Sequence, residues 1–273
     1  MIIGVTGGKG GTGKTVLAVN LAVALAGKAS VAYLDCDADC PSAHIIVGAE
    51  LQNKQGVYSF LPEFIEEKCT HCGKCTSVCQ FNALYQLKGE APTLVESLCS
   101  GCGACMLACP FGAIKESRKT IGWTHAYEKY GIDFFSGELR PGEPLSEKIV
   151  DAVKERGLAK EYDIVVVDTA AGAHCQVVCA LEGCDKALAV TEPTQFGMHD
   201  LEVISEVLNK LGIPFETIVN RSTISDKKIE SSLEIPYDKK MIECYVEGVP
   251  IIEKYPKHPI SKKIAEFAER LIK

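Results

Sequence analysis

The chain has 273 residues, of which 47% are hydrophobic and 24% are charged, and its formal net charge is −7. These proportions are ordinary for a globular protein, and the length allows one large α/β domain or one domain with an insert. The acidic balance and the lack of a dense Lys/Arg run argue against nucleic acid as a partner. No apolar run approaches the ~20 residues that span a bilayer. Met1 leads directly into a predicted strand, so we expect no signal peptide, no membrane partner and a cytoplasmic location.

A glycine-rich turn follows the first predicted strand. Residues 1–6 are mainly apolar, residues 7–15 read GGKGGTGKT, and residues 16–26 form an apolar helical stretch. From Gly8 to Thr15 the chain fits G-x-x-x-x-G-K-[ST], the phosphate loop, in its expected setting between a strand and a helix. Backbone N–H groups and the positive helix end can wrap a polyphosphate there. The predicted nucleotide-binding residues of the loop are Gly8, Gly10, Gly11, Thr12, Gly13, Lys14 and Thr15.

Two side chains of this loop have predicted chemical roles. Lys14 is expected to neutralise the β- and γ-phosphates, and the Thr15 hydroxyl to ligate Mg²⁺. The predicted cofactors are therefore ATP or ADP and Mg²⁺, which makes the chain a candidate ATPase. The alternative is a plain glycine-rich hairpin.

The string that begins at Lys9, KGGTGKT, resembles the deviant Walker A loop of the MinD/ParA/Mrp superfamily. Nitrogenase iron protein and the arsenite-pump ATPases share that loop. The resemblance implies a nucleotide-dependent homodimer, in which Lys9 reaches the partner's nucleotide and Lys14 acts on its own. Alternatively, Lys9 is a solvated loop charge.

A second apolar run, residues 31–34, predicts a buried parallel strand that ends at an acidic segment. Carboxylates at the C-terminal end of such a strand lie beside the phosphate loop in an open α/β sheet. The segment resembles the D-x-D switch I region of the same superfamily, and the resemblance implies that Asp37 orients or activates the attacking water while Asp35 supports the Mg²⁺ shell. The alternative is a set of loop carboxylates that cap a helix.

The fourteen cysteines are unevenly placed. Eight of them form an internal repeat, in which CTHCGKCTSVCQFNAL is followed by CSGCGACMLACPFGAI. Disulfides are rare in a reducing cytosol, so metal ligation is the better explanation. The spacing matches the bacterial ferredoxin pattern, in which the fourth cysteine of each run ligates the other cluster. Gln80 stands in the place of the usual proline in the first copy.

On that pattern the chain is predicted to hold two [4Fe–4S] clusters. The first set of ligands is Cys69, Cys72, Cys75 and Cys109, and the second set is Cys99, Cys102, Cys105 and Cys79. Zinc usually takes paired C-x₂-C halves rather than three evenly spaced cysteines and a fourth, so zinc and a disulfide set are the weaker alternatives. Purely structural clusters are a further alternative, because small domains use metals for stability.

The α/β pattern resumes after about residue 118. Residues 164–167 predict a central strand that ends at Asp168, a Walker B position where a carboxylate holds Mg²⁺ through a water. The string DTAAG resembles the superfamily's D-T-P-P-G switch II, with Ala170 and Ala171 in place of the prolines. A helix N-cap is the alternative role for Asp168.

A strand over residues 215–219 is expected to carry the base site. In the superfamily an Asn at the end of this strand reads the adenine edge, which implies Asn220 and its neighbour Arg221 as base-binding residues; a turn-forming Asn is the alternative. Another strand is predicted over residues 188–190. Helices are predicted over residues 144–156, 198–211, 223–233, 238–247 and 261–273, and residues 51–68 and 123–142 are read as irregular.

Six cysteines lie outside the repeat: Cys36, Cys40, Cys175, Cys179, Cys184 and Cys244. Free cysteine is often a small buried hydrophobe, and we interpret these six in that way. Cys175 and Cys179 are expected on one helix after switch II, near the place where nitrogenase iron protein holds its bridging cluster, but the C-P-x-C pair is missing.

The predicted fold class is α/β: a mostly parallel P-loop NTPase sheet flanked by helices, with a small inserted bacterial-ferredoxin-like α+β domain. The predicted domains are residues 1–60 and 118–273 for the ATPase and residues 61–117 for the insert. The predicted function is MgATP hydrolysis coupled to electron transfer through the two clusters, toward an unidentified redox or iron–sulfur partner. The alternatives are an iron–sulfur carrier or scaffold of the Mrp type and a positioning ATPase with structural clusters.

Overall fold

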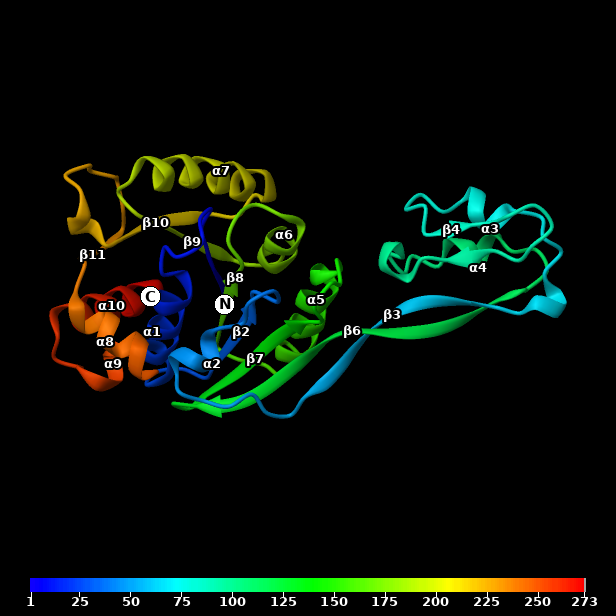
Figure 1. Ribbon diagram of the computed structural model, residues 1–273. Helices are drawn as coiled ribbons and strands as arrows, with labels where there is room; N and C mark the ends of the chain where they lie inside the picture. Colours follow the sequence, from blue (N-terminus) through cyan, green and yellow to red (C-terminus); the bar gives the residue numbers. More distant parts are fainter. Residues whose placement is uncertain (273) are drawn as a thin grey trace. The chain divides into compact units, whose positions relative to one another are not determined.

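The computed structural model of the protein describes residues 1–272, and these divide into two compact units. Unit 1 takes in Met1–Gln55, Thr124–Glu138 and the chain from Ser146 on. Unit 2 takes in Gly56–Trp123 and Leu139–Leu145. The chain therefore passes from unit 1 to unit 2 and back twice, and most of unit 2 lies in the first of these passages, which Figure 1 colours cyan to green. The predicted insert boundaries, residues 61–117, stay a prediction.

Parallel strands with apolar residues on both faces form the sheet of unit 1. They are β1 (Ile2–Thr6), β2 (Val31–Cys36), β7 (Ile132–Leu139), β8 (Ile164–Thr169), β9 (Lys186–Thr191), β10 (Phe215–Asn220) and β11 (Leu233–Ile235). Within residues 1–272 the sheet has nine strands in the order β11-β10-β9-β1-β8-β2-β7-β6-β3. β1 pairs in parallel with β8 and with β9, and β8 also pairs in parallel with β2. The loops that follow these strands therefore meet at one edge of the sheet.

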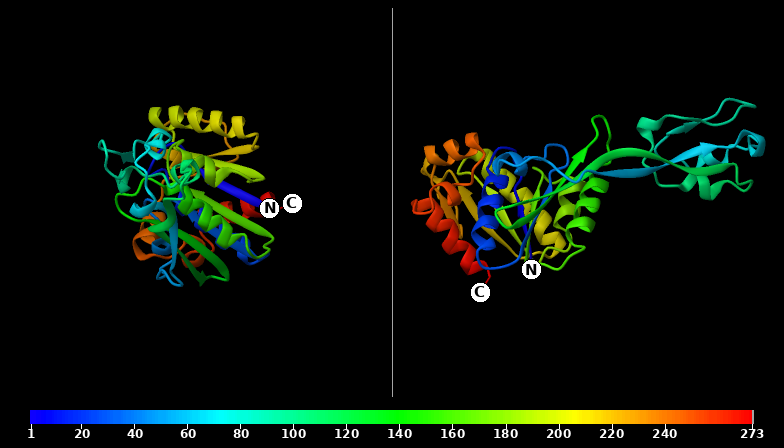
Figure 2. Two further views of the ribbon diagram at one scale, coloured as in Figure 1. Left: turned by 90° about the vertical axis from the view of Figure 1, so that its right-hand side faces the viewer. Right: turned by 90° about the horizontal axis from the view of Figure 1, so that it is seen from below.

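Helices cover both faces of this sheet (Figure 2). One core contains buried residues of α1 (Lys14–Ala26), α8 (Lys239–Glu247), α9 (Ile251–Lys254) and α10 (Pro259–Leu271), with the short α2 (Ala43–Ile46) beside them. The other core contains residues of α5 (Ser146–Gly157), α6 (Cys175–Leu181) and α7 (Gln195–Leu211). Along β2, Val31 and Tyr33 belong to the first core, whereas Ala32 and Leu34 belong to the second. Among the described residues, no helix is both long and apolar enough to cross a membrane.

Two stretches that were expected to be irregular contain strands. β3 (Gln55–Phe64) and the 3₁₀ turn η1 (Glu66–Lys68) occupy most of residues 51–68. β6 (Ile114–Lys129) is joined to β7 through Tyr130 and Gly131, whose φ angles of 53° and 71° are both left-handed. A two-residue turn with both φ positive matches the twist of a hairpin. The prediction failed here because Gly122 and several charged residues interrupt the apolar pattern of β6.

The predicted helix over residues 223–233 is wrong. The structure has a short 3₁₀ turn, η3 (Ser222–Ile224), and then β11, whose Leu233 and Ile235 are buried against β10. The Ser225 hydroxyl accepts a hydrogen bond from the Lys227 N–H at 3.2 Å, and such local bonds compete with helix formation. The other predicted helices and strands are present with shifted ends, and the last residue of the predicted C-terminal helix, Lys273, lies outside the described residues.

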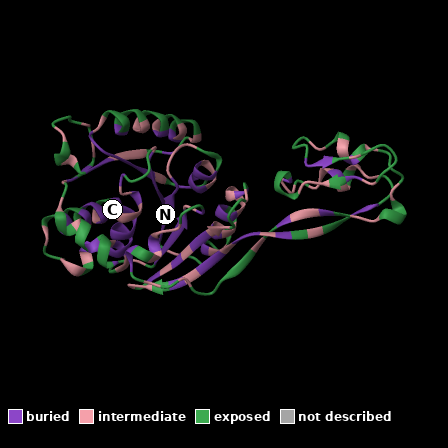
Figure 3. Cartoon of the chain, viewed as in Figure 1, coloured by how far each residue is buried: buried purple, intermediate pink, exposed green. Residues whose placement is uncertain are grey.

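Unit 2 contains two copies of one local backbone. The first is η1 followed by α3 (Lys74–Ser77), and the second is η2 (Glu96–Leu98) followed by α4 (Ala104–Ala108). Gly73 and Gly103 precede the two helices with φ angles of 74° and 73°, which favour glycine. β4 (Leu84–Tyr85) and β5 (Thr93–Leu94) pair antiparallel. Figure 3 shows buried residues along the strands of unit 1 and more exposed residues in unit 2.

Candidate functional site

The predicted phosphate loop connects β1 to α1, and its glycines leave the backbone uncovered by side chains. Gly11 and Gly13 have φ angles of 81° and 87°, which glycine adopts without steric cost. A Cβ at Gly13 would lie 2.3 Å from Asn220 Nδ2. A Cβ at Gly8 would lie 2.6 Å from the carbonyl oxygen of Asp200. Gly10 is open to solvent on its side-chain face, with no neighbour closer than 4.0 Å.

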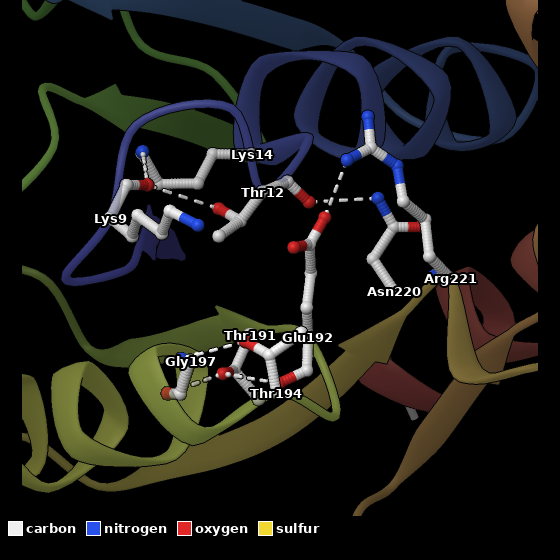
Figure 4. Close-up of polar contacts among 9 residues, drawn as sticks. All are labelled: Lys9, Thr12, Lys14, Thr191, Glu192, Thr194, Gly197, Asn220 and Arg221. Atoms are coloured by element: carbon white, nitrogen blue, oxygen red, sulfur yellow. Dashed lines mark hydrogen bonds and ion pairs between the residues drawn. The ribbon is translucent and has the colours of Figure 1, made fainter. Parts of the chain in front are cut away.

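The two lysines of the loop lie in different surroundings (Figure 4). Lys14 is buried, and its Nζ donates to the Lys9 carbonyl oxygen at 3.1 Å. Burial lowers the pKa of Lys14, and the nearby Asp168 and Asp37 charges oppose that shift. The Lys9 side chain is exposed, with its Nζ 5.9 Å from the centre of the Phe196 ring. Lys14 is thus held within its own loop, whereas Lys9 is presented to the outside.

Two carboxylates meet at the ends of β8 and β2. Asp168 and Asp35 are register partners and are both fully buried. The Tyr33 hydroxyl donates to Asp168 Oδ2 at 3.0 Å, while the buried Asp168 Oδ1 has no hydrogen-bond partner among the described residues. Burial raises the pKa of Asp168 to about 7, and the nearby Thr15 hydroxyl and Lys14 ammonium oppose this rise. Asp168 therefore has one oxygen fixed and one oxygen available, next to the phosphate loop.

Asp35 orders the segment that follows β2. Its Oδ2 accepts from the Ser42 and Ala43 N–H groups at 3.0 Å each, and its Oδ1 accepts from the Asp37 N–H at 3.3 Å. Burial and the Asp168 charge raise the pKa of Asp35 well above its usual range. Its present partners are backbone amides, and its part in an Mg²⁺ shell stays a prediction.

Asp37 is partly buried, and its Oδ1 accepts from the Cys40 N–H at 3.2 Å. Burial raises the pKa of Asp37, and the Cys40 N–H and the Lys14 ammonium oppose the rise. The Lys14 charge therefore acts on both Asp37 and Asp168. The structure thus brings together side chains of the phosphate loop, of the segment after β2 and of the end of β8.

The segment after β8 is tied to the phosphate loop. The Gly172 N–H donates to the Gly7 carbonyl oxygen at 3.3 Å, and the Thr169 and Thr6 hydroxyls are 3.0 Å apart. Gly172 has a φ of 95°, which only glycine adopts easily. These bonds couple the predicted switch II segment directly to the loop.

Asn220 also supports the phosphate loop (Figure 4). Its Nδ2 donates to the Thr12 carbonyl oxygen at 2.8 Å, and its Oδ1 accepts from the Arg221 N–H at 2.9 Å. Arg221 Nη1 pairs with Glu192 Oε1 at 2.6 Å. Thr12 additionally donates its hydroxyl to the Lys9 carbonyl oxygen at 3.3 Å. The predicted base-binding residues are therefore within one hydrogen bond of the predicted phosphate-binding residues.

In unit 2 the repeat cysteines surround two cavities, each with an empty volume of about 340 Å³ that includes open solvent. Cavity A is lined by Cys69, Cys72, Cys75 and Cys109. Cavity B is lined by Cys79, Cys99, Cys102 and Cys105. Each cavity thus takes three cysteines from one copy of the repeat and the fourth from the other copy. No His, Asp or Glu is part of either lining.

All fourteen cysteines are free thiols in the structure. Among residues 1–272, no three His, Cys, Asp or Glu side chains are placed to hold a single metal ion. Of the six cysteines outside the repeat, three are buried: Cys36, Cys184 and Cys244. Cys40 and Cys175 are exposed, so the interpretation of all six as buried hydrophobes is wrong for these two, which lie in the loop after β2 and at the start of α6.

The family model of the CobQ/CobB/MinD/ParA nucleotide binding domain matches residues 3–265. The chain belongs to this family. Among its relatives, MJ0579 of Methanocaldococcus jannaschii is 41% identical over 273 residues, covering 100% of this chain and 98% of the relative. MJ0547 of the same organism, described as an ATP-binding protein, is 27% identical over 284 residues, covering 99% of this chain and 87% of the relative.

Solved structures of the family show the same fold. MinD of Pyrococcus horikoshii, in complex with Mg-ADP, superposes with a TM-score of 0.62 at 20% identity, covering 99% of this chain and 95% of that one. MinD in the MinC:MinD complex of Aquifex aeolicus superposes with a TM-score of 0.59 at 22% identity, covering 100% of this chain and 96% of that one. The mostly parallel α/β sheet flanked by helices, predicted from the sequence, is thereby confirmed.

Sequence reasoning missed two residues of the site. Tyr33 is fully buried and fixes Asp168, and Glu192 fixes Arg221. Tyr33 places a polar hydroxyl inside an apolar strand, and a buried Tyr hydroxyl usually has a hydrogen-bond partner. Its position two residues before Asp35 could therefore have indicated a contact with the predicted carboxylates. Glu192 gave no such signal, because its partner lies 29 residues away in the chain.

Proposed function

We propose that this chain is an ATPase of the MinD/ParA type, which binds MgATP at residues 8–15 and hydrolyses it. Asp168, near the end of β8, lies close to Thr15 and Lys14 of the phosphate loop, and this supports the proposal. The Asp168 Oδ1 atom, buried and without a partner, fits a position at which a water on Mg²⁺ supplies the missing hydrogen bond. In the proposal the Thr15 hydroxyl ligates Mg²⁺, and Asp35 adds negative charge to the surroundings of the ion.

Asp37 and Lys9 carry the hydrolytic step in this proposal. Asp37 orients the attacking water, and its position beside the Lys14 charge supports that role. Lys9 is exposed on the loop, which fits a charge presented to the nucleotide of a second copy in a nucleotide-dependent homodimer. Catalysis is then mainly positioning and neutralisation of phosphate charge.

Asn220 and Arg221 are the proposed base-binding residues. An Asn amide donates and accepts at once, which suits the N6 and N7 edge of adenine. The bond from Asn220 to the Thr12 carbonyl oxygen uses one of its two N–H groups, so the second N–H is left for the base. The same bond ties base binding to the shape of the phosphate loop.

We further propose that residues 61–117 form a ferredoxin-like insert between two parts of the ATPase, residues 1–60 and 118–273. The observation that carries this proposal is the crossed grouping of eight cysteines around cavities A and B. Four thiols around each cavity is the ligand number of a [4Fe–4S] cluster, and three from one run with one from the other is the bacterial ferredoxin arrangement. When bound, such clusters supply one-electron redox chemistry.

No single-ion site is present among residues 1–272, so the cluster proposal rests on the crossed grouping of the cysteines. Ligands of one ion must converge on one point at about 2.3 Å for a thiolate on zinc. Ligands of a four-iron cube are spread around a larger body, so their sulfur atoms stay apart.

The proposed function is nucleotide-gated electron transfer to a partner protein. The strands β3, β6 and β7 each cross from one unit to the other, so they are candidates to transmit a change at the phosphate loop. The alternative functions, an iron–sulfur carrier of the Mrp type and a positioning ATPase with structural clusters, differ in a measurable way. A carrier transfers its cluster to an apo-protein, and a positioning ATPase does not need a reducible cluster.

The proposed cofactors are tested by anaerobic purification of the full chain with iron and sulfide counts and EPR of the reduced protein. We expect two [4Fe–4S] clusters for each chain. A zinc-loaded or iron-free protein that retains ATP binding would contradict the cluster proposal and leave the ATPase proposal intact. Transfer of iron and sulfide to an apo-ferredoxin, with no stable reduced state, would favour the carrier.

A further inference from the structure

We propose that Lys74 makes cavity A the stronger electron acceptor of the two cysteine-lined cavities, so that an electron entering at cavity B passes to cavity A. This inference rests on the proposed clusters, which both cavities would have to hold. It concerns a difference in redox potential between two sites whose linings are otherwise similar because of the repeat.

The two cavities have equivalent linings. Residues at matching positions of the repeat line both of them: Gly73 and Gly103, Thr70 and Ser100, Phe111 and Phe81, Ala113 and Ala83, Ile114 and Leu84, Phe64 and Leu94, and Pro92 and Pro62. These pairs match in character, since each joins two apolar or two hydroxyl residues or two glycines. They give no reason for the two sites to differ in charge.

The linings differ in charge at one position of the repeat and in polarity at two further residues. Lys74 lines cavity A, and its counterpart in the repeat, Ala104, lines cavity B. In addition, Gln86 lines only cavity A, and Phe60 lines only cavity B. Cavity A is therefore lined by a residue with a cationic side chain and one with an amide, where cavity B is lined by an alanine and a phenylalanine.

The hydrogen bonds to sulfur differ as well. In cavity A, the Ala113 N–H donates to Cys109 Sγ at 3.3 Å. Among residues 1–272, no matching bond from the Ala83 N–H to Cys79 Sγ is present. Cavity A thus has more groups that favour negative sulfur.

These groups set the order of reduction. Reduction adds one negative charge to a site, and the potential of an iron–sulfur site depends on nearby charge, hydrogen bonds to sulfur and solvent exposure. A lysine ammonium and a backbone N–H stabilise the added charge, whereas Phe60 cannot. The exchange is a one-electron transfer: cavity B loses the electron that cavity A gains, and no bond or proton is exchanged. A one-electron donor protein would supply cavity B.

Because Lys74 is exposed, water and salt screen its charge, and its effect is moderate. The test is an EPR-monitored redox titration of the full chain, purified anaerobically with both sites loaded. We expect two separate midpoint potentials in the native chain. For scale, a tenfold change in the partition of one electron between the sites corresponds to about 59 mV.

Three variants identify the cause. Lys74→Ala should lower the higher midpoint and bring the two together. Ala104→Lys should raise the lower midpoint, and the double variant should exchange the order of the sites. Lys88→Ala is the matched control, because Lys88 is exposed in unit 2 and lines neither cavity; it should leave both midpoints unchanged. The site of the first electron is read from the paramagnetic NMR shifts of the assigned cysteine Hβ protons.

Any of three results would overturn the inference while leaving the clusters in place, and two of them concern the midpoints. They are coincident midpoints in the native chain, and midpoints that Lys74→Ala does not move although iron and sulfide counts are normal. First reduction at the cysteines of cavity B would also contradict it. An iron-free chain would contradict both this inference and the proposed clusters, and the iron count distinguishes that case from the others.

Discussion

At the scale of single residues, the two lysines of the predicted nucleotide site differ in burial and in hydrogen bonding. Lys14 is buried in the loop and bonded to a backbone carbonyl oxygen, whereas Lys9 is exposed beside Phe196. This difference supports two different roles for residues of one motif. Sequence alone indicates both lysines, but only the fold shows that one faces inward and the other faces outward.

Substitution of Lys14 and of Lys9 should separate these roles. Lys14→Ala removes the charge that lies within the loop, so we expect ATP binding and hydrolysis to be lost together. Lys9→Ala should leave the affinity for ATP nearly unchanged and lower turnover by about a hundredfold or more, the size seen when one charge-stabilising donor is removed. Phosphate release and equilibrium nucleotide binding measure the two effects. Equal losses of affinity for both variants would contradict the assignment.

Tyr33 should stabilise unit 1 through its bond to Asp168. Tyr33→Phe leaves a buried carboxylate without its hydrogen bond, which costs about 1–3 kcal/mol in the free energy of unfolding. Tyr127→Phe is the matched control, because both rings lie 5.1 Å from the Phe134 ring and the Tyr127 hydroxyl neighbours Ser136 rather than Asp168. Chemical denaturation measures both variants, and equal destabilisation would show that the bond to Asp168 is unimportant.

At the scale of elements, the sequence predicts most of the strands and helices of unit 1. β2 and β8 are apolar runs that are buried along their whole length, so local composition suffices to find them. The strands β3, β6, β7 and β11 were missed, because strand formation depends on pairing and packing context as well as on local composition. The bond between Asn220 and Thr12, which are 208 residues apart, is likewise visible only in the folded chain.

The start of α7 offers a test of one such element. The Thr194 hydroxyl caps the helix by accepting from the Gly197 N–H at 3.0 Å. Thr194→Ala should destabilise unit 1 by about 1 kcal/mol, the usual cost of a lost N-cap. Thr194→Ser keeps the oxygen and should cost much less. Thermal or chemical unfolding compares them, and similar losses for Ala and Ser would mean that the methyl group rather than the cap matters.

At the scale of the whole molecule, the chain joins a nucleotide-binding fold to a unit rich in cysteine. The family and its fold account for unit 1. The two cavities of unit 2 account for the spacing of the eight repeat cysteines, since each cavity takes its fourth cysteine from the other copy. This crossed grouping could be predicted from the sequence, because the spacing resembles the bacterial ferredoxin pattern, in which the fourth cysteine of each run ligates the other cluster.

Cys109→Ser tests the crossed grouping. Cys109 follows Cys105 in the chain but lines cavity A with Cys69. We therefore expect this variant to lose or alter the signal of the site built from Cys69, Cys72 and Cys75, and to preserve the site that includes Cys99. EPR together with iron counts measures the loss. Damage to the site of Cys99 instead would show that each run holds its own four ligands.

The central claim is that nucleotide state controls the redox behaviour of the cysteine-lined sites. The most direct measurement is an EPR-monitored redox titration of the full chain in MgADP and in MgATP, with Lys14→Ala as the variant that cannot respond. We predict that at least one midpoint potential moves when MgATP replaces MgADP in the native chain and does not move in the variant. Midpoints that are the same in both nucleotides, in a chain shown to bind both, would contradict the claim.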